Sequence, residues 1–102
     1  MKKYETLLLL DPEMGAEGRQ GLLDNLTGIV ERDGGQVVEV DDWGQKELAY
    51  PVRKVTRGRY VRLEYGLPAE KVAELERNIR IADEVFKFMT VNLTDEFEQE
   101  AS

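Results

Sequence analysis

The chain has 102 residues and a mass of 11.7 kDa, the size of one domain with a single core. It contains neither cysteine nor histidine, which excludes disulfides, thiolate nucleophiles, Cys/His zinc sites and Ser-His-Asp catalysis. Its net charge of −7 argues against a nucleic-acid partner unless the charge is unevenly distributed. Without a long apolar stretch or a signal core, the sequence predicts a soluble cytoplasmic protein.

The first half begins with an expected strand and helix. Residues Tyr4–Leu10 are apolar on both faces, which predicts a strand near the middle of a sheet, ended by Pro12. The period then changes to that of an amphipathic helix over Ala16–Asp33, and Gly34 ends it. The apolar face of this helix comprises Leu22, Leu26, Ile29 and Val30.

Two extended segments follow. Residues Gln36–Ala49 are typical of a strand with a bulge at Gly44. We predict a turn at Arg57-Gly58, because glycine often marks a change of chain direction. The strand after it alternates, and its apolar members are expected to face the core. These core-facing residues are Val61, Leu63 and Tyr65.

The last third predicts a second helix and a final strand. Pro68 suits the first turn of a helix whose stripe is Val72, Leu75 and Ile79. Residues Val85–Leu93 are typical of a strand, and residues 94–102 are expected to form a disordered acidic tail. The order predicts a single α+β domain over residues 1–93. Its fold would be ferredoxin-like βαββαβ, a four-stranded antiparallel sheet with two helices on one face.

Charge is segregated along the chain. Between Leu48 and Leu63 every charged residue is basic, and after Val91 every charged residue is acidic. The basic residues are Arg53, Lys54, Arg57, Arg59 and Arg62. Two interpretations remain equally open from the pattern. The segment is either a phosphate-binding hairpin or a solvated connection that keeps a sheet edge soluble.

Aromatic residues leave further alternatives. The segment Arg57–Leu63 partly matches the strand signature of RNA-recognition motifs, so Tyr60 could stack on a base or simply favour a strand. Trp43 suits either core packing or the anchoring of a protein partner. A small ferredoxin-like enzyme would need an arginine in a phosphate-cradling turn facing an asparagine, and the sequence offers no such loop.

Five segments resemble a known family. They are the start Met1–Glu5, the pair Asp11-Pro12, the stretch Gly35–Gly44, the stretch Leu48–Lys54 followed by Gly58–Tyr60, and Asn78–Val85. Together they resemble protein six of the bacterial small ribosomal subunit over about residues 2–93. The resemblance implies a ferredoxin-like, non-enzymatic protein of the cytoplasmic ribosome. It implies a heterodimer with protein eighteen on the central domain of the small-subunit ribosomal RNA. No cofactor, metal, membrane or small-molecule substrate is expected.

The resemblance and the basic segment together predict the binding residues. The RNA-binding set is Lys2, Tyr4, Arg53, Lys54, Arg57, Arg80 and Lys87. The partner-binding set is Trp43, Leu48, Tyr50 and Tyr60. One departure concerns the stretch before Leu48, where only Lys46 is basic although the family commonly has two or three basic residues. We expect the arginines after Lys54 to compensate for this.

Overall fold

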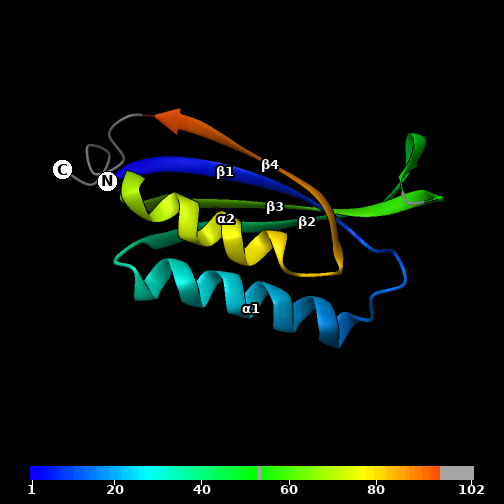
Figure 1. Ribbon diagram of the computed structural model, residues 1–102, viewed down its shortest axis with the longest axis horizontal. Helices are drawn as coiled ribbons and strands as arrows, with labels where there is room; N and C mark the ends of the chain where they lie inside the picture. The colour runs from blue at the N-terminus through cyan, green and yellow to red at the C-terminus, as the bar shows by residue number, and fades with distance from the viewer. Residues whose placement is uncertain (53, 95–102) are drawn as a thin grey trace.

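The computed structural model describes residues 1–52 and 54–94, with side chains to residue 93. Its strands are β1 (Lys2–Leu10), β2 (Gln36–Val52), β3 (Val55–Leu67) and β4 (Val85–Thr94), and its helices are α1 (Ala16–Arg32) and α2 (Val72–Arg80), the latter preceded by the 3-10 turn Ala69–Lys71. The strands form one antiparallel sheet in the order β2-β3-β1-β4. Both helices lie on the same side of it (Figure 1), which confirms the predicted ferredoxin-like fold.

Strand β1 lies between two neighbours, which explains why both of its faces carry leucine. Leu8 is opposite Val61 of β3 and Phe88 of β4. Its core side packs against the helices, where Leu26, Val30, Leu75 and Ile79 are fully buried. The buried hydroxyl of Thr6 lies 2.8 Å from the Tyr65 hydroxyl and 2.9 Å from Thr90 Oγ1, so the core leaves this polar group hydrogen-bonded.

The connection between β2 and β3 differs from the prediction. Arg57 and Gly58 lie within β3, paired with Glu47 and Lys46, so the predicted turn there is wrong. The ladder closes at Val52 opposite Val55, and Lys54 in the turn adopts a left-handed φ of 64°. Gly58 is required for space instead, since a Cβ atom would overlap the Leu9 side chain.

The predicted bulge at Gly44 is confirmed. The register between β2 and β3 shifts between Asp42 and Gly44, and Gly44 has a φ of 84°. The amide of Gly44 donates a hydrogen bond to Asp42 Oδ1 at 3.0 Å. This local kink turns the following part of β2 relative to the first part.

The start of β2 provides a test of the packing. A Cβ atom on Gly35 would overlap the backbone carbonyl oxygen of Gly66, whereas one on Gly28, in α1, would meet open space. We predict that Gly35→Ala lowers the free energy of unfolding by about 1–3 kcal/mol. The obstructing atom is a backbone carbonyl oxygen, which cannot move aside as the end of a flexible side chain could. Gly28→Ala should raise it by up to about 1 kcal/mol, because alanine favours helix. Urea unfolding of the two variants checks this, and equal effects would contradict it.

Candidate functional site

One face of the sheet has no helices, and the side chains on it define the candidate site, here called the open face. Side chains alternate between the two faces along each strand. Strand register places on the open face Lys3, Glu5, Leu7 and Leu9 of β1, Tyr60, Arg62 and Glu64 of β3, and Lys87, Met89 and Val91 of β4. Met89 is 59% exposed, so apolar surface is open to solvent here.

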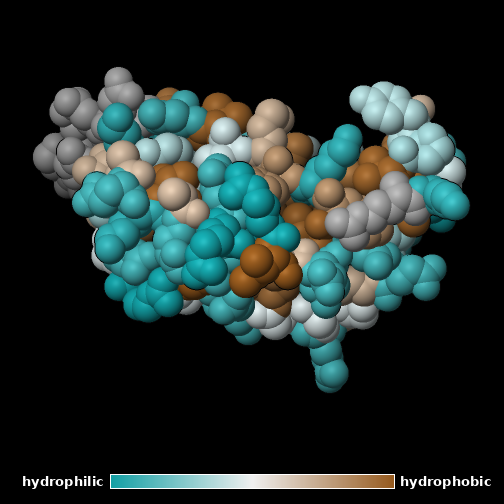
Figure 2. Space-filling model, in the orientation of Figure 1, coloured by the Kyte–Doolittle hydropathy of each residue, from teal (hydrophilic) through white to brown (hydrophobic). Residues whose placement is uncertain are grey.

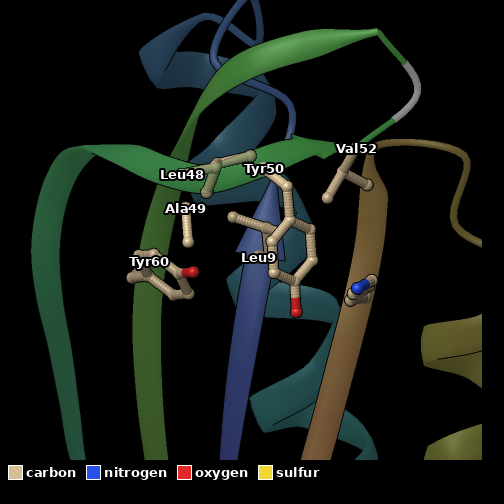
Figure 3. Close-up of a pocket in the computed structure, with 7 residues that line it drawn as sticks. Leu9, Leu48, Ala49, Tyr50, Val52 and Tyr60 are labelled. Atoms are coloured by element: carbon tan, nitrogen blue, oxygen red, sulfur yellow. The ribbon is translucent and has the colours of Figure 1, made fainter.

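A segment of β2 folds across one end of this face. Between Glu47 and Val52 the ladder is irregular, and residues 48–51 of β2 oppose only Thr56 of β3. We call residues 48–51 the strap. In Figure 3 the strap passes over the end of β1, with Leu9 beneath it. Leu9 is therefore only 5% exposed although it lies on the open face.

The strap and the sheet form an apolar groove. Its lining consists of Leu7, Leu9, Tyr50, Tyr60, Lys87, Phe88 and Met89. Tyr50 extends from the strap and is 68% exposed, and the Lys87 ammonium lies 5.8 Å from the centre of its ring. Next to the groove, the rings of Trp43 and Tyr60 are 6.5 Å apart. An apolar floor with exposed aromatic walls is typical of a protein-binding surface.

A network of charges lies beside the groove. We call it the Arg62 cluster, and it comprises Arg62, Lys3, Glu5, Glu39 and Glu64. The Arg62 guanidinium lies 2.8 Å from Glu5, 2.7 Å from Glu64 and 3.5 Å from Glu39. The ammonium of Lys3 lies 2.8 Å from Glu64. The hydrogen bond from Lys3, followed by that from Arg62, lowers the pKa of Glu64 despite its burial.

Arg59 belongs to a second charge group, on the helix side of the sheet. Its Nη2 lies 3.0 Å from Asp42 Oδ2, and Arg19 Nε of α1 lies 3.3 Å from the same oxygen. Desolvation would raise the pKa of Asp42, but hydrogen bonds from Arg59 and the Gly44 amide outweigh it and lower the pKa. Arg59 and Arg62 are therefore both paired with carboxylates of the chain itself, although Arg59 shares Asp42 with Arg19.

Two cations of the hairpin differ from these arginines. Lys54 and Arg57 are exposed, and neither has an ion pair within residues 1–52 and 54–94. Arg53, predicted with them to bind RNA, lies outside the described residues. The hairpin projects beyond the end of the helices in Figure 1, so its cations are accessible to a large ligand.

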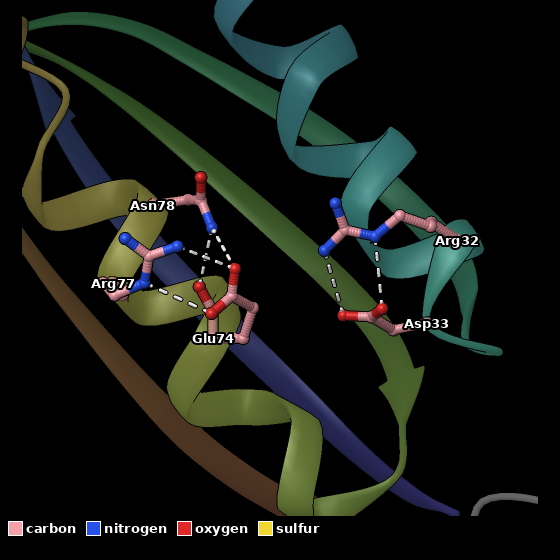
Figure 4. Close-up of polar contacts among 5 residues, drawn as sticks. All are labelled: Arg32, Asp33, Glu74, Arg77 and Asn78. Atoms are coloured by element: carbon pink, nitrogen blue, oxygen red, sulfur yellow. Dashed lines mark hydrogen bonds and ion pairs between the residues drawn. The ribbon is translucent and has the colours of Figure 1, made fainter.

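The helix side presents a different surface. Figure 4 shows the Arg32 guanidinium on Asp33 and the Arg77 guanidinium on Glu74, at 3.2 and 2.9 Å. Asn78 adds a hydrogen bond from its side-chain amide to Glu74 Oε2 at 3.2 Å. In Figure 2 the surface over the helices is mainly hydrophilic. These basic groups are therefore matched by carboxylates and offer no separate cationic patch.

The other predicted RNA-binding residues do not lie together. Tyr4 is 7% exposed and its ring stacks on Tyr65 in the core at 5.9 Å, so we assign it to packing and correct the prediction for this residue. Lys2 lies at the end of β1 opposite Leu67, far from the hairpin. Arg80 is on the helix side, 5.5 Å from the ring of Phe88, whereas Lys87 is on the open face.

All predicted partner-binding residues lie at or near the groove. Tyr50 and Tyr60 line it, Trp43 packs beside Tyr60, and Leu48 belongs to the strap, with its side chain near Gly58. Sequence reasoning missed Leu7 and Met89. The signal for Leu7 was available, because alternation along β1 places it on the same face as Leu9.

Two further properties concern the part of the chain described. Neither helix within residues 1–52 and 54–94 is long and apolar enough to cross a membrane. Over the same residues, no group of three or more acidic side chains is arranged to hold a metal ion.

The Arg62 cluster predicts a pH dependence. Because folding lowers the pKa of Glu64, its contribution to stability is present above the unfolded value near 4.5 and is lost as the pH falls below it. Glu64→Gln should therefore be less stable than the parent at neutral pH, with the difference shrinking in acid. Urea unfolding at a series of pH values measures this. Glu13→Gln, an exposed carboxylate outside the cluster, is the control, and a difference independent of pH would contradict the prediction.

Comparison with known proteins identifies the family. A family model described as "Ribosomal protein S6" matches residues 3–92. The "Small ribosomal subunit protein bS6" of Nitratidesulfovibrio vulgaris is 59% identical and covers 99% of this chain and 100% of its own. The protein of that name from Desulfovibrio desulfuricans is 62% identical over 94% of both chains.

A solved structure agrees with the fold. The crystal structure of 30S ribosomal protein S6 from Thermotoga maritima superposes with a TM-score of 0.84, at 24% identity, over 98% of this chain and 92% of that chain. The sequence matches confirm the predicted family independently of this fold likeness. The chain therefore belongs to the ribosomal protein S6 family and is a non-enzymatic component of the small subunit of the cytoplasmic bacterial ribosome.

Proposed function

We propose that the chain binds the central domain of the small-subunit ribosomal RNA as a heterodimer with protein eighteen. The observation that carries the proposal is the apolar groove on the open face, next to a hairpin with exposed cations. The assignment to the ribosome rests on family membership. The choice of protein eighteen and of the central RNA domain rests on what the resemblance of the sequence implies. The groove and the hairpin supply one surface for each.

The groove is assigned to the protein partner. Tyr50 and Met89 are 68% and 59% exposed, and Trp43 is 44% exposed, so a large part of their apolar surface is available for burial. Aromatic residues and methionine are enriched at protein interfaces and often contribute most of the binding energy. Leu48 is part of the strap and its side chain lies near Gly58, outside the groove lining, so we assign it to support of the groove.

The hairpin is assigned to RNA. Lys54 and Arg57 are exposed on the hairpin, which extends beyond the helices (Figure 1), so phosphates can approach them without meeting the Arg62 cluster. Each phosphate contact releases counterions and strengthens binding. With only a few such contacts on a body of net charge −7, the chain alone should bind RNA weakly. A partner with its own contacts would raise the affinity of the pair.

A free-standing RNA-recognition module is less well supported. Such a module stacks bases on aromatic side chains of its two central strands. Here the open-face residues of β1 are Lys3, Glu5, Leu7 and Leu9, which include no aromatic ring, and Tyr4 lies in the core. This observation favours the heterodimer.

The partner assignment predicts the effect of a charge in the groove. Met89→Glu should weaken the affinity for protein eighteen at least about tenfold, because a carboxylate would be desolvated in an apolar contact. Val38→Glu, at a position 45% exposed but outside the groove lining, is the matched control. Titration calorimetry with the purified partner measures both. Equal losses for the two variants would place the interface elsewhere.

The RNA assignment predicts a change in salt dependence. With protein eighteen present, Lys54→Ala/Arg57→Ala should flatten the slope of log affinity against log salt by about 0.7–0.9 for each phosphate that is no longer neutralised. Lys71→Ala/Arg77→Ala, which removes the same charge from the helix side, should leave the slope unchanged. Filter binding to a central-domain RNA fragment checks this. The unmodified chain should bind the fragment more tightly with its partner than alone, and equal affinities would overturn the cooperative model.

A further inference from the structure

The open face has most of the parts of a surface on which RNA bases stack. Trp43, which is 44% exposed, forms an aromatic pair with the half-buried Tyr60, and Lys87 and Arg62 lie on the same face. Aromatic rings beside cations bind single-stranded nucleic acid with little regard to sequence. Because the chain functions inside a ribonucleoprotein, RNA could bind non-specifically to this surface.

The Arg62 cluster changes the electrostatics of that surface. Glu5, Glu39 and Glu64 surround Arg62, and Lys3 is the second cation of the cluster. With two cations and three carboxylates the cluster has a net charge of −1. Arg62 Nε and Nη2 donate hydrogen bonds to Glu5 and Glu64 at 2.8 and 2.7 Å, and Nη1 lies 3.5 Å from Glu39. Each nitrogen of the guanidinium therefore faces a carboxylate, with which a phosphate would have to compete.

The three carboxylates of the cluster differ in their exposure to solvent. Glu64 is nearly buried and holds both Lys3 and Arg62, which gives it a structural role. The Glu39 side chain is 57% exposed and lies 3.5 Å from Arg62, and the Glu5 side chain is 28% exposed. An ion pair with an exposed carboxylate, such as Glu39–Arg62, contributes little to stability, whereas the part-buried hydrogen bond between Arg62 and Glu5 also supports the fold. The charges of Glu5 and Glu39 still act on any anion that approaches the face.

We infer that Glu5 and Glu39 are specificity-determining residues that exclude nucleic acid from the open face and keep it available for a protein. They do so by neutralising Arg62 and by repelling phosphates near Trp43 and Tyr60. Discrimination by repulsion of the wrong ligand is a general route to specificity. The biological reason for the exclusion rests on the proposed function, but the exclusion itself is a property of the isolated chain.

The test uses the full chain and a labelled oligouridine, without the partner or ribosomal RNA. Glu5→Gln/Glu39→Gln changes the cluster from −1 to +1, because two of its three carboxylates become neutral. It should bind the oligomer at least about tenfold more tightly than the parent at low salt. The salt slope should steepen by about 0.7 for each phosphate that Arg62 then contacts. Urea unfolding of this variant, and of Glu39→Gln alone, shows that the fold is retained.

The matched control is Glu17→Gln/Glu31→Gln. It removes two exposed carboxylates from α1, on the other side of the sheet, and has the same net charge as the test variant. It should change the affinity less than about threefold, since salt screens distant surface charges. Equal increases in affinity for the two double variants, or no increase for the first, would overturn the inference.

The location of the bound RNA is read from fluorescence. Trp43 is the only tryptophan of the chain, so its emission reports on the open face. Oligouridine should quench it in Glu5→Gln/Glu39→Gln and not in the control. Adding Tyr60→Leu to Glu5→Gln/Glu39→Gln should lower the affinity of that variant for oligouridine about fivefold or more. An increase that survives this change without quenching would mean that RNA binds elsewhere, and it would overturn the inference. Either negative result leaves the proposed function standing, because that rests on the partner and ribosomal RNA.

Discussion

Both helices pack on the same face of the four-stranded sheet (Figure 1), and this arrangement determines the rest of the molecule. On the covered face the chain buries its leucines around Leu8, Leu26 and Leu75. Neither helix covers the other face (Figure 1). The chain closes one end of that face with the strap over Leu9, and leaves the groove beside it open. The exposed apolar surface thus follows from the topology, and a surface of this kind is typical of an interaction site.

The charges follow the same division. A body with a net charge of −7 would repel RNA everywhere if its charges were evenly mixed. Instead, Arg59 and Arg62 are paired with carboxylates of the chain, whereas Lys54 and Arg57, among the described residues of the hairpin, are exposed and have no such partner. The basic segment that looked uniform in the sequence therefore has two parts, an internally paired part near the sheet and an exposed part near the turn.

Part of the site could be predicted and part could not. The aromatic residues at the groove, Tyr50 and Tyr60, were found from the resemblance, and the structure brings them together. The pairing of Arg62 with Glu5 could not be found, because the two residues are distant in the chain and meet only through the pairing of β3 with β1. For the same reason Tyr4, a good candidate by type, proved to lie in the core.

The sequence by itself determined the order of the strands and helices and their approximate positions, because hydrophobic periods of 2 and 3.6 are local properties. It also determined the fold class through their order, and the family through its motifs. Only the tertiary structure decided which face of β1 is buried, where the hairpin turns and which of its cations remain accessible. Those outcomes depend on strand register, and a shift of one residue exchanges the two faces of a strand. Glycine at position 58 illustrates this, since it marks a close approach of Leu9 from another strand and no turn at all.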